Sequence, residues 1–391
     1  MKKIAKILLI SIVSLVAVLY IGVFLGHHVI FPENRSEVPT IEAVADGQFL
    51  FGPTAHSNQP TTVEEYILVL ASHLSAYNSI AEEIWPGNAL VDLSLIVEDV
   101  GRKQFYHIDY EGNAEQISKD EAMSFDIQRM PEVNGFSAFD GGMYLAITEQ
   151  DMTNYLNWQK YLHFGMYDPF LFFTHEGFHM EEQPKWSQME TISNMGRDEY
   201  MENIEARTLR YRLQCQLLEA VSHPDDTERI LEALATYEYW KESFPEDFEN
   251  SIYFDRIEGT AYYFELLTGL YAAYPDQIQD KESLDSALAL LAIRDDIYTG
   301  HGLISEAYYI GGFTGVLLDR VDADWKQVLM DDGDATPISL LYSHFEGENL
   351  PPVKALSQQE MDDVLERIHT PDPDSNKGMP LFFRFLYDML W

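Results

Sequence analysis

The segment from Leu171 to Gln183, LFFTHEGFHMEEQ, places two histidines and a glutamate directly after an apolar run. His175 and His179 are four residues apart, so on a helix both imidazoles lie on one face and can reach one metal ion. Glu176 leans toward the same place, where a carboxylate can take a proton from a metal-bound water. The spacing therefore predicts a metal site with two histidine ligands and Glu176 as general base.

The alternative is that these three polar residues are satisfied by ordinary hydrogen bonds in a buried helix. Asp168 and Pro169 are typical of a helix start, and the apolar run PFLFF at 169–173 predicts that this helix is mainly buried. Burying two imidazoles and a carboxylate without partners would cost several kcal/mol. A shared cation removes that cost, which favours the metal site.

A catalytic zinc ion needs a third protein ligand and an open position for water. Because Cys215 is the single cysteine, a cysteine-rich site and an intramolecular disulfide are excluded, and carboxylates are the candidates. The nearest in sequence are Glu199, Glu202 and Glu205. Spacing favours this group. The local sequence favours Glu258, because the next residue, Gly259, is costly in a helix interior and a small residue beside a ligand would let the HEGFH helix approach closely. The alternative is that Gly259 serves helix packing alone.

Three residues on the same helix face as Glu258 are candidates to orient the ligating imidazoles: Asp255, Tyr262 and Glu265. The alternative for the two acidic residues is that they are solvated carboxylates on the protein surface.

HEGFH followed by EGTAYYFE resembles the gluzincin-type zincin metallopeptidases, and among them the bacterial families in which H-E-x-x-H precedes an E-G-x-A-x-Y helix. The resemblance covers His175 to Glu265 and, loosely, the helices after it. It implies a zincin-like catalytic domain with one Zn²⁺ on His175, His179 and Glu258, and Glu176 as the general base. The gap between the two motifs is longer than in many relatives, which leaves Glu205 or Glu199 open as the third ligand.

A peptidase also needs a hydrogen-bond donor for the oxyanion that forms at the scissile carbonyl. The segment YTGHGLISEAYYIGGF supplies His301, Tyr308 and Tyr309 beside glycines that allow close packing. The resemblance gives this role to a later histidine or tyrosine, which makes His301 and Tyr308 the candidates, although most tyrosines serve packing alone. By analogy of fold, the strand at 135–139 is expected to be a sheet edge that holds an extended peptide.

Elements able to position these residues can be read from the apolar pattern. Helical spacing behind a threonine cap predicts a helix at 61–85 that Pro86 and Gly87 stop. Alternation around Val100 and Gly101 predicts a hairpin, and a second strand pair is expected at 135–147. Further helices are predicted at 198–223, 225–244, 251–274 and 284–298, and on toward Trp391. We expect one α+β domain at 61–391, predominantly α-helical, with a small N-terminal antiparallel sheet.

The N-terminus predicts a transmembrane signal anchor at 1–26. Three lysines precede an apolar run from Ile7 to Gly26, which at 1.5 Å per helical residue is long enough to cross a bilayer. The basic flank places the rest of the chain outside the cytoplasm, joined by a linker at 27–60. A cleaved signal peptide is the alternative.

The balance of charged residues limits the classes of molecule that the protein can bind. With 25 Lys and Arg against 65 Asp and Glu, the formal charge of −40 disfavours binding to nucleic acid. We therefore expect a membrane-anchored extracytoplasmic zinc peptidase that acts on a peptide or protein. The alternative is a non-catalytic, acidic, membrane-anchored interaction module with a structural or vestigial zinc site, but such a site has no need of Glu176.

Overall fold

The structure is a computed structural model of the 391-residue chain. It describes residues 62–87, 93–125, 127–129, 136–139, 142–147, 169–187, 203–273, 278, 280–292, 303–322 and 324–369. The described residues up to Ile368 belong to one compact unit. The expected membrane anchor and linker lie outside the described residues. Within the described part of the chain, no helix is both long and apolar enough to span a membrane.

The first described helix, α2 (Val63–Ile84), begins two residues after and ends one residue before the predicted boundaries. The side chain of Thr62 accepts a hydrogen bond from the backbone nitrogen of Glu65 at 3.2 Å, which caps the first turn. The helix ends at Trp85, and Gly87 then turns the chain with a φ of 71°. Its apolar face is buried in the main core, while its outer face is exposed.

Six strands form one sheet in the order β3-β2-β1-β6-β5-β4. They are β1 (Ser94–Asp99), β2 (Gln104–Ile108), β3 (Ala114–Ile117), β4 (Gln128–Arg129), β5 (Phe136–Phe139) and β6 (Gly142–Ile147). The two predicted strand pairs are confirmed as β1–β2 and β5–β6, both antiparallel. The expectation of an antiparallel sheet was wrong, because β1 and β6 join the two pairs in parallel.

The strand β5 is not a sheet edge, which corrects the expected peptide-binding edge. It pairs with β6 on one side, and on the other side it pairs with β4 through Ala138 and Ser137. The edges of the described sheet are β3 and β4. Residue 135, at the start of the expected edge strand, lies outside the described residues.

The two faces of the sheet contribute to two separate hydrophobic clusters. Leu95 and Val97 of β1 belong to the main core, whereas Ile96 between them packs with Phe105 and Ile117 on the opposite face. The short helix α3 (Lys119–Ala122) and the 3₁₀ turn after it (Met123–Phe125) contribute to this smaller cluster.

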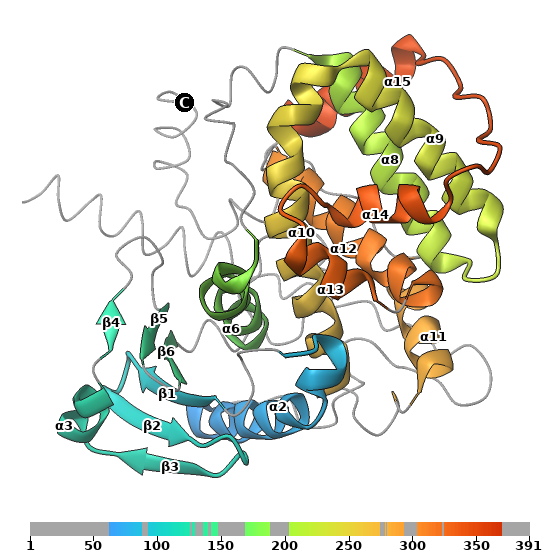
Figure 1. The fold of residues 1–391 in the computed structure, drawn as a ribbon. Helices are drawn as coiled ribbons and strands as arrows, with labels where there is room; N and C mark the ends of the chain where they lie inside the picture. The colour runs from blue at the N-terminus through green and yellow to red at the C-terminus, as the bar shows by residue number, and fades with distance from the viewer. Residues whose placement is uncertain are drawn as a thin grey trace, which may run out of the picture. The chain divides into compact units, whose positions relative to one another are not determined.

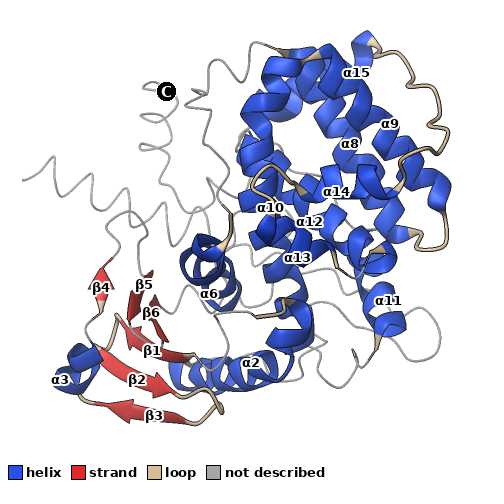
Figure 2. Cartoon of the chain, viewed as in Figure 1, coloured by secondary structure: helices blue, strands red, loops and turns tan. Residues whose placement is uncertain are grey.

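Helices dominate the chain beyond the sheet (Figure 2). They are α6 (Pro169–Gly177), α8 (Ile204–Ser222), α9 (Thr227–Ser243), α10 (Pro245–Ala273), α11 (Lys281–Ala292), α12 (Leu303–Val321), α13 (Trp325–Asp331), α14 (Pro337–His344) and α15 (Gln358–His369). The predicted helices are thus confirmed where the structure describes them. The fold is α+β and predominantly helical, as expected.

Helix α6 packs against β6 on one side and against α10 on the other (Figure 1). After Gly177 it continues as a π-helical turn, Phe178–Glu182, and then as a 3₁₀ turn, Gln183–Lys185. A π-turn inside a helix is rare and is frequent at functional sites. Here it begins one residue before His179.

Helices α10 and α12 lie side by side and cross at glycines (Figure 1). A Cβ atom on Gly259 would lie 2.5 Å from the Cα atom of Gly311, so neither position can carry a side chain at this separation. Gly259 therefore faces α12, and the expectation that it lets the HEGFH helix approach was wrong. Its role is the helix packing considered as the alternative.

Candidate metal centre

Three side chains from two helices converge on one point. His175 and His179 come from the HEGFH helix, and Glu258 comes from the middle of α10. The Nε2 atoms of the two imidazoles are 3.1 Å apart. Oε2 of Glu258 lies 3.5 Å from Nε2 of His175 and 3.3 Å from Nε2 of His179. In the described part of the chain, this is the group of His, Cys, Asp and Glu residues that could hold a metal ion.

The dimensions of this triangle suit a tetrahedral zinc ion. Zinc bonds to histidine nitrogen and carboxylate oxygen are roughly 2.0–2.2 Å long, so two ligand atoms at the tetrahedral angle are about 3.3 Å apart. The three observed separations, 3.1, 3.3 and 3.5 Å, surround that value. Two nitrogens and one oxygen are also the donor set of a catalytic zinc site with a fourth position open.

Each histidine has a hydrogen-bond partner behind it. Nδ1 of His175 lies 2.8 Å from Oε2 of Glu265, one of the candidate orienting residues. Nδ1 of His179 lies 2.7 Å from Oε1 of Gln183, which the sequence analysis missed. Its only sequence signal is the four-residue spacing from His179, which places both side chains on one helix face.

The other two candidate orienting residues have different surroundings. Asp255 is buried and accepts two hydrogen bonds from Arg210, at 3.0 and 2.6 Å, so its assignment to the imidazoles was wrong. Tyr262 is buried and packs against the rings of Tyr308 and Tyr309. The alternative of solvated surface carboxylates fails as well, because Glu265 is 13% exposed.

The candidate third ligands differ in their distance from the two histidines. Glu258 lies within the group, whereas Glu205 is exposed at the start of α8 and is not part of it. Glu199 and Glu202 lie outside the described residues.

The cluster attracts positive charge. Burial alone would lower the pKa of His175, but the carboxylates of Glu258 and Glu265 outweigh burial and raise that pKa to about 10. Burial likewise opposes ionisation of Glu258, yet the two histidines hold its pKa well below the ordinary value. The carboxylates of Glu258 and Glu265 thus place a negative potential at His175.

Of the other predicted catalytic residues, the structure describes Glu176 and Tyr308. Glu176 is half-buried, and its charge acts on both Glu265 and Tyr308. The ring of Tyr308 lies 5.3 Å from that of His175, between ring centroids. Burial and the negative charges of Glu258 and Glu265 raise the pKa of Tyr308 far above its ordinary value, so its hydroxyl stays a neutral donor. His301 lies outside the described residues.

Arg256 holds the end of the HEGFH helix against α10. Its guanidinium donates to the backbone oxygen of Ser187 at 3.0 Å and lies over the ring of Trp186, 5.5 Å from the ring centroid. It also donates to the oxygens of Leu329 and Ala335, at 2.6 and 2.5 Å. One side chain thus joins the helix that carries the histidines, the helix that carries Glu258, and the α13–α14 region.

A buried ion network adjoins the cluster. Arg207 and Arg210 of α8 pair with Asp247 and Asp255 of α10 and with Glu306 of α12. Asp255 precedes Glu258 by one helical turn, and Glu306 lies two residues before Tyr308. The network therefore joins α8 to both helices that carry Glu258 and Tyr308.

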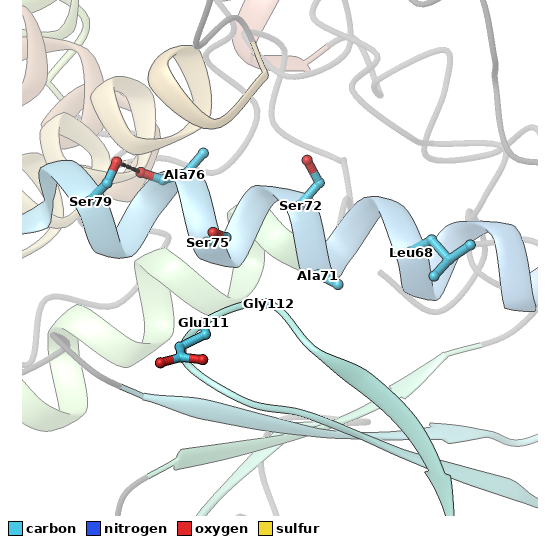
Figure 3. A pocket seen from close by; sticks show the side chains of 8 residues that line it. All are labelled: Leu68, Ala71, Ser72, Ser75, Ala76, Ser79, Glu111 and Gly112. Atoms are coloured by element: carbon cyan, nitrogen blue, oxygen red, sulfur yellow. Dashed lines mark hydrogen bonds between the residues drawn. The ribbon is translucent and has the colours of Figure 1, made fainter.

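An open surface pocket lies elsewhere, on α2 (Figure 3). Small side chains of α2, among them Ala71 and Ser75, face the β2–β3 turn at Gly112. A Cβ on Gly112 would lie 2.6 Å from the backbone oxygen of Ala71, so the turn requires glycine, whose φ here is 84°. Glu111 is the one titratable group in the lining, and none of the metal-centre residues takes part.

Comparisons of the chain with protein-family models, with curated proteins and with solved structures gave no match.

Proposed function

We propose that this protein is a membrane-anchored, extracytoplasmic zinc peptidase with a zincin-like catalytic domain. His175, His179 and Glu258 hold one Zn²⁺ in this proposal. The observation that carries it is the triangle of two Nε2 atoms and one carboxylate oxygen, with edges of 3.1, 3.3 and 3.5 Å. The anchor and the outside location rest on the N-terminal sequence alone.

A zinc ion held by these three residues would supply an activated water and polarise the scissile carbonyl. Glu176 accepts the proton of the attacking water and delivers it to the leaving amine. The neutral hydroxyl of Tyr308 donates a hydrogen bond to the oxyanion, with His301 as the other candidate donor. Glu265 accepts from Nδ1 of His175, which would leave the Nε2 lone pair of that ring available to a metal ion.

The purified full-length protein is expected to contain zinc and to hydrolyse members of a mixed peptide library, and a chelator is expected to remove both metal and activity. Metal analysis, thermal unfolding and mass spectrometry of the library measure these outcomes. Folded, zinc-bound protein without hydrolysis would favour the interaction module instead. Protein without zinc, whose thermal stability chelation leaves unchanged, would exclude a zinc site under either function.

Glu258→Ala is expected to weaken zinc binding by more than about 100-fold, because losing a metal ligand should cost more than losing a ligand's hydrogen-bond partner, which costs about 10- to 100-fold. The reason is that Glu258 supplies the anionic oxygen of the triangle. Glu205→Ala is the matched control, because Glu205 is exposed on α8, and it should bind zinc like the parent. Competition with a chromogenic chelator measures both affinities. Loss of zinc affinity in the Glu205 variant alone would show that Glu205, and not Glu258, is the third ligand.

A further inference from the structure

Gln183 lies buried between the HEGFH helix and α10, with 5% of its surface exposed. Its Nε2 atom donates to the backbone oxygen of Ile257 at 2.7 Å and to Oγ1 of Thr260 at 3.0 Å. Its Oε1 atom lies 2.7 Å from Nδ1 of His179. One neutral side chain thus spans from a histidine of the candidate metal centre to the helix that carries Glu258.

The contacts on α10 fix which way the amide of Gln183 points. A backbone carbonyl only accepts, so the NH₂ group must face Ile257. The hydroxyl of Thr260 gives its own hydrogen to the backbone oxygen of Arg256 at 2.6 Å, so it also accepts from Gln183. The reversed amide would place its oxygen against a carbonyl oxygen. Oε1 must therefore face His179.

The fixed amide in turn decides where His179 carries its proton. An amide oxygen only accepts, so the hydrogen of a neutral imidazole must be on Nδ1. The lone pair is then on Nε2, the atom that lies 3.1 Å from Nε2 of His175 and 3.3 Å from Oε2 of Glu258. A carboxylate could also accept from Nδ1, as Glu265 does for His175. It would add negative charge and could not donate to Ile257.

We infer that Gln183 is a positioning residue with two effects. It holds His179 in the Nδ1–H tautomer, and it ties the histidine-bearing helix to the turn of α10 on which Ile257 and Thr260 flank Glu258. The identity of the bound cation as zinc rests on the proposed function, whereas the tautomer is a property of the protein itself.

The tautomer can be tested on the unmutated protein. Full-length, histidine-¹⁵N-labelled protein is examined without metal by long-range ¹H–¹⁵N correlation spectra, at a pH at which the ¹⁵N shifts show that His179 is neutral, with His179 assigned by the loss of its signals in His179→Asn. The expected result is a proton on Nδ1 and none on Nε2. A proton on Nε2 of His179 would overturn the inference even if the protein binds zinc and cleaves peptides.

Variants separate orientation from packing. Gln183→Met keeps nearly the same volume, so a mere packing role predicts no change, whereas the inference predicts a mixture of both tautomers and 10- to 100-fold weaker zinc binding. Gln183→Glu keeps an acceptor for Nδ1, so it should keep the parental tautomer. The control is Gln214→Leu, because Gln214 is fully buried on α8 and its amide makes no hydrogen bond within the described residues.

Parental tautomer and zinc affinity within twofold of the parent in Gln183→Met would contradict the inference. Chelator competition measures the affinity, and circular dichroism confirms that each variant is folded. A protein that binds no zinc would refute the proposed function, and the tautomer spectra of the parent and the Met variant would still decide the role of Gln183.

Discussion

Glu176→Gln is expected to slow peptide hydrolysis by about 10²- to 10⁴-fold, the usual contribution of a positioned general base, while zinc binding stays at the parental level. Glutamine keeps the size of the side chain but cannot take the proton of the attacking water. Glu176 is not part of the His175, His179 and Glu258 group, so its loss leaves the three ligand atoms in place.

Charge is the main confounding effect, because the carboxylate of Glu176 also acts on Glu265 and Tyr308. Glu181→Gln removes one carboxylate from the same helix and is the matched control. It should hydrolyse peptides at close to the parental rate. Steady-state kinetics on a substrate from the library, together with metal analysis, compare the two variants. Parental activity in Glu176→Gln would show that another group is the base.

Local sequence patterns were sufficient for the helices and hairpins. The threonine cap before α2 and the proline at the start of α6 are signals within a few residues of the element they begin. The strands β3 and β4 were missed because the first is largely exposed, without apolar alternation, and the second is two residues long. The parallel pairing of β1 with β6 depends on residues far apart in the sequence, which a local pattern does not encode.

The candidate site shows the same division. The two histidines of HEGFH could be singled out because their spacing is local. The glycine after Glu258 pointed to the helix whose carboxylate lies beside them, although that glycine packs against α12. Asp255 shares a helix face with Glu258, but the face argument could not foresee that Arg210 of α8 reaches it first. Gln183 was missed because its contacts with α10 form only when the helices pack.

The buried ion network around Arg210 is the other feature whose loss should have a large effect. Arg210 donates to both oxygens of Asp255, at 2.6 and 3.0 Å, and to Oε2 of Glu306 at 2.6 Å. Its guanidinium also lies over the ring of Trp240, 4.7 Å from the centroid. Burial alone would lower the pKa of Arg210, but Asp255 and Glu306 outweigh it and raise that pKa, so the charge is permanent.

Arg210→Met is expected to lower the free energy of unfolding by about 3–5 kcal/mol, because it leaves Asp255 buried without its arginine partner and leaves buried Glu306 with one of its two arginines. Arg229→Met is the control: Arg229 pairs with Glu219 and Asp226 at the surface, where such pairs contribute about 0–1 kcal/mol. Urea denaturation followed by circular dichroism measures both variants.

If the two variants lose the same free energy of unfolding, the buried ion pairs of Arg210 contribute no more to stability than the surface pairs of Arg229. A much larger loss in Arg210→Met has a consequence for the metal centre as well. Asp255 lies one turn before Glu258 on α10, and Glu306 lies two residues before Tyr308 on α12. Without Arg210, the negative charges of Asp255 and Glu306 are less compensated and repel each other, which should disturb the two helices that hold Glu258 and Tyr308. Zinc affinity should therefore fall together with stability in Arg210→Met and remain parental in Arg229→Met.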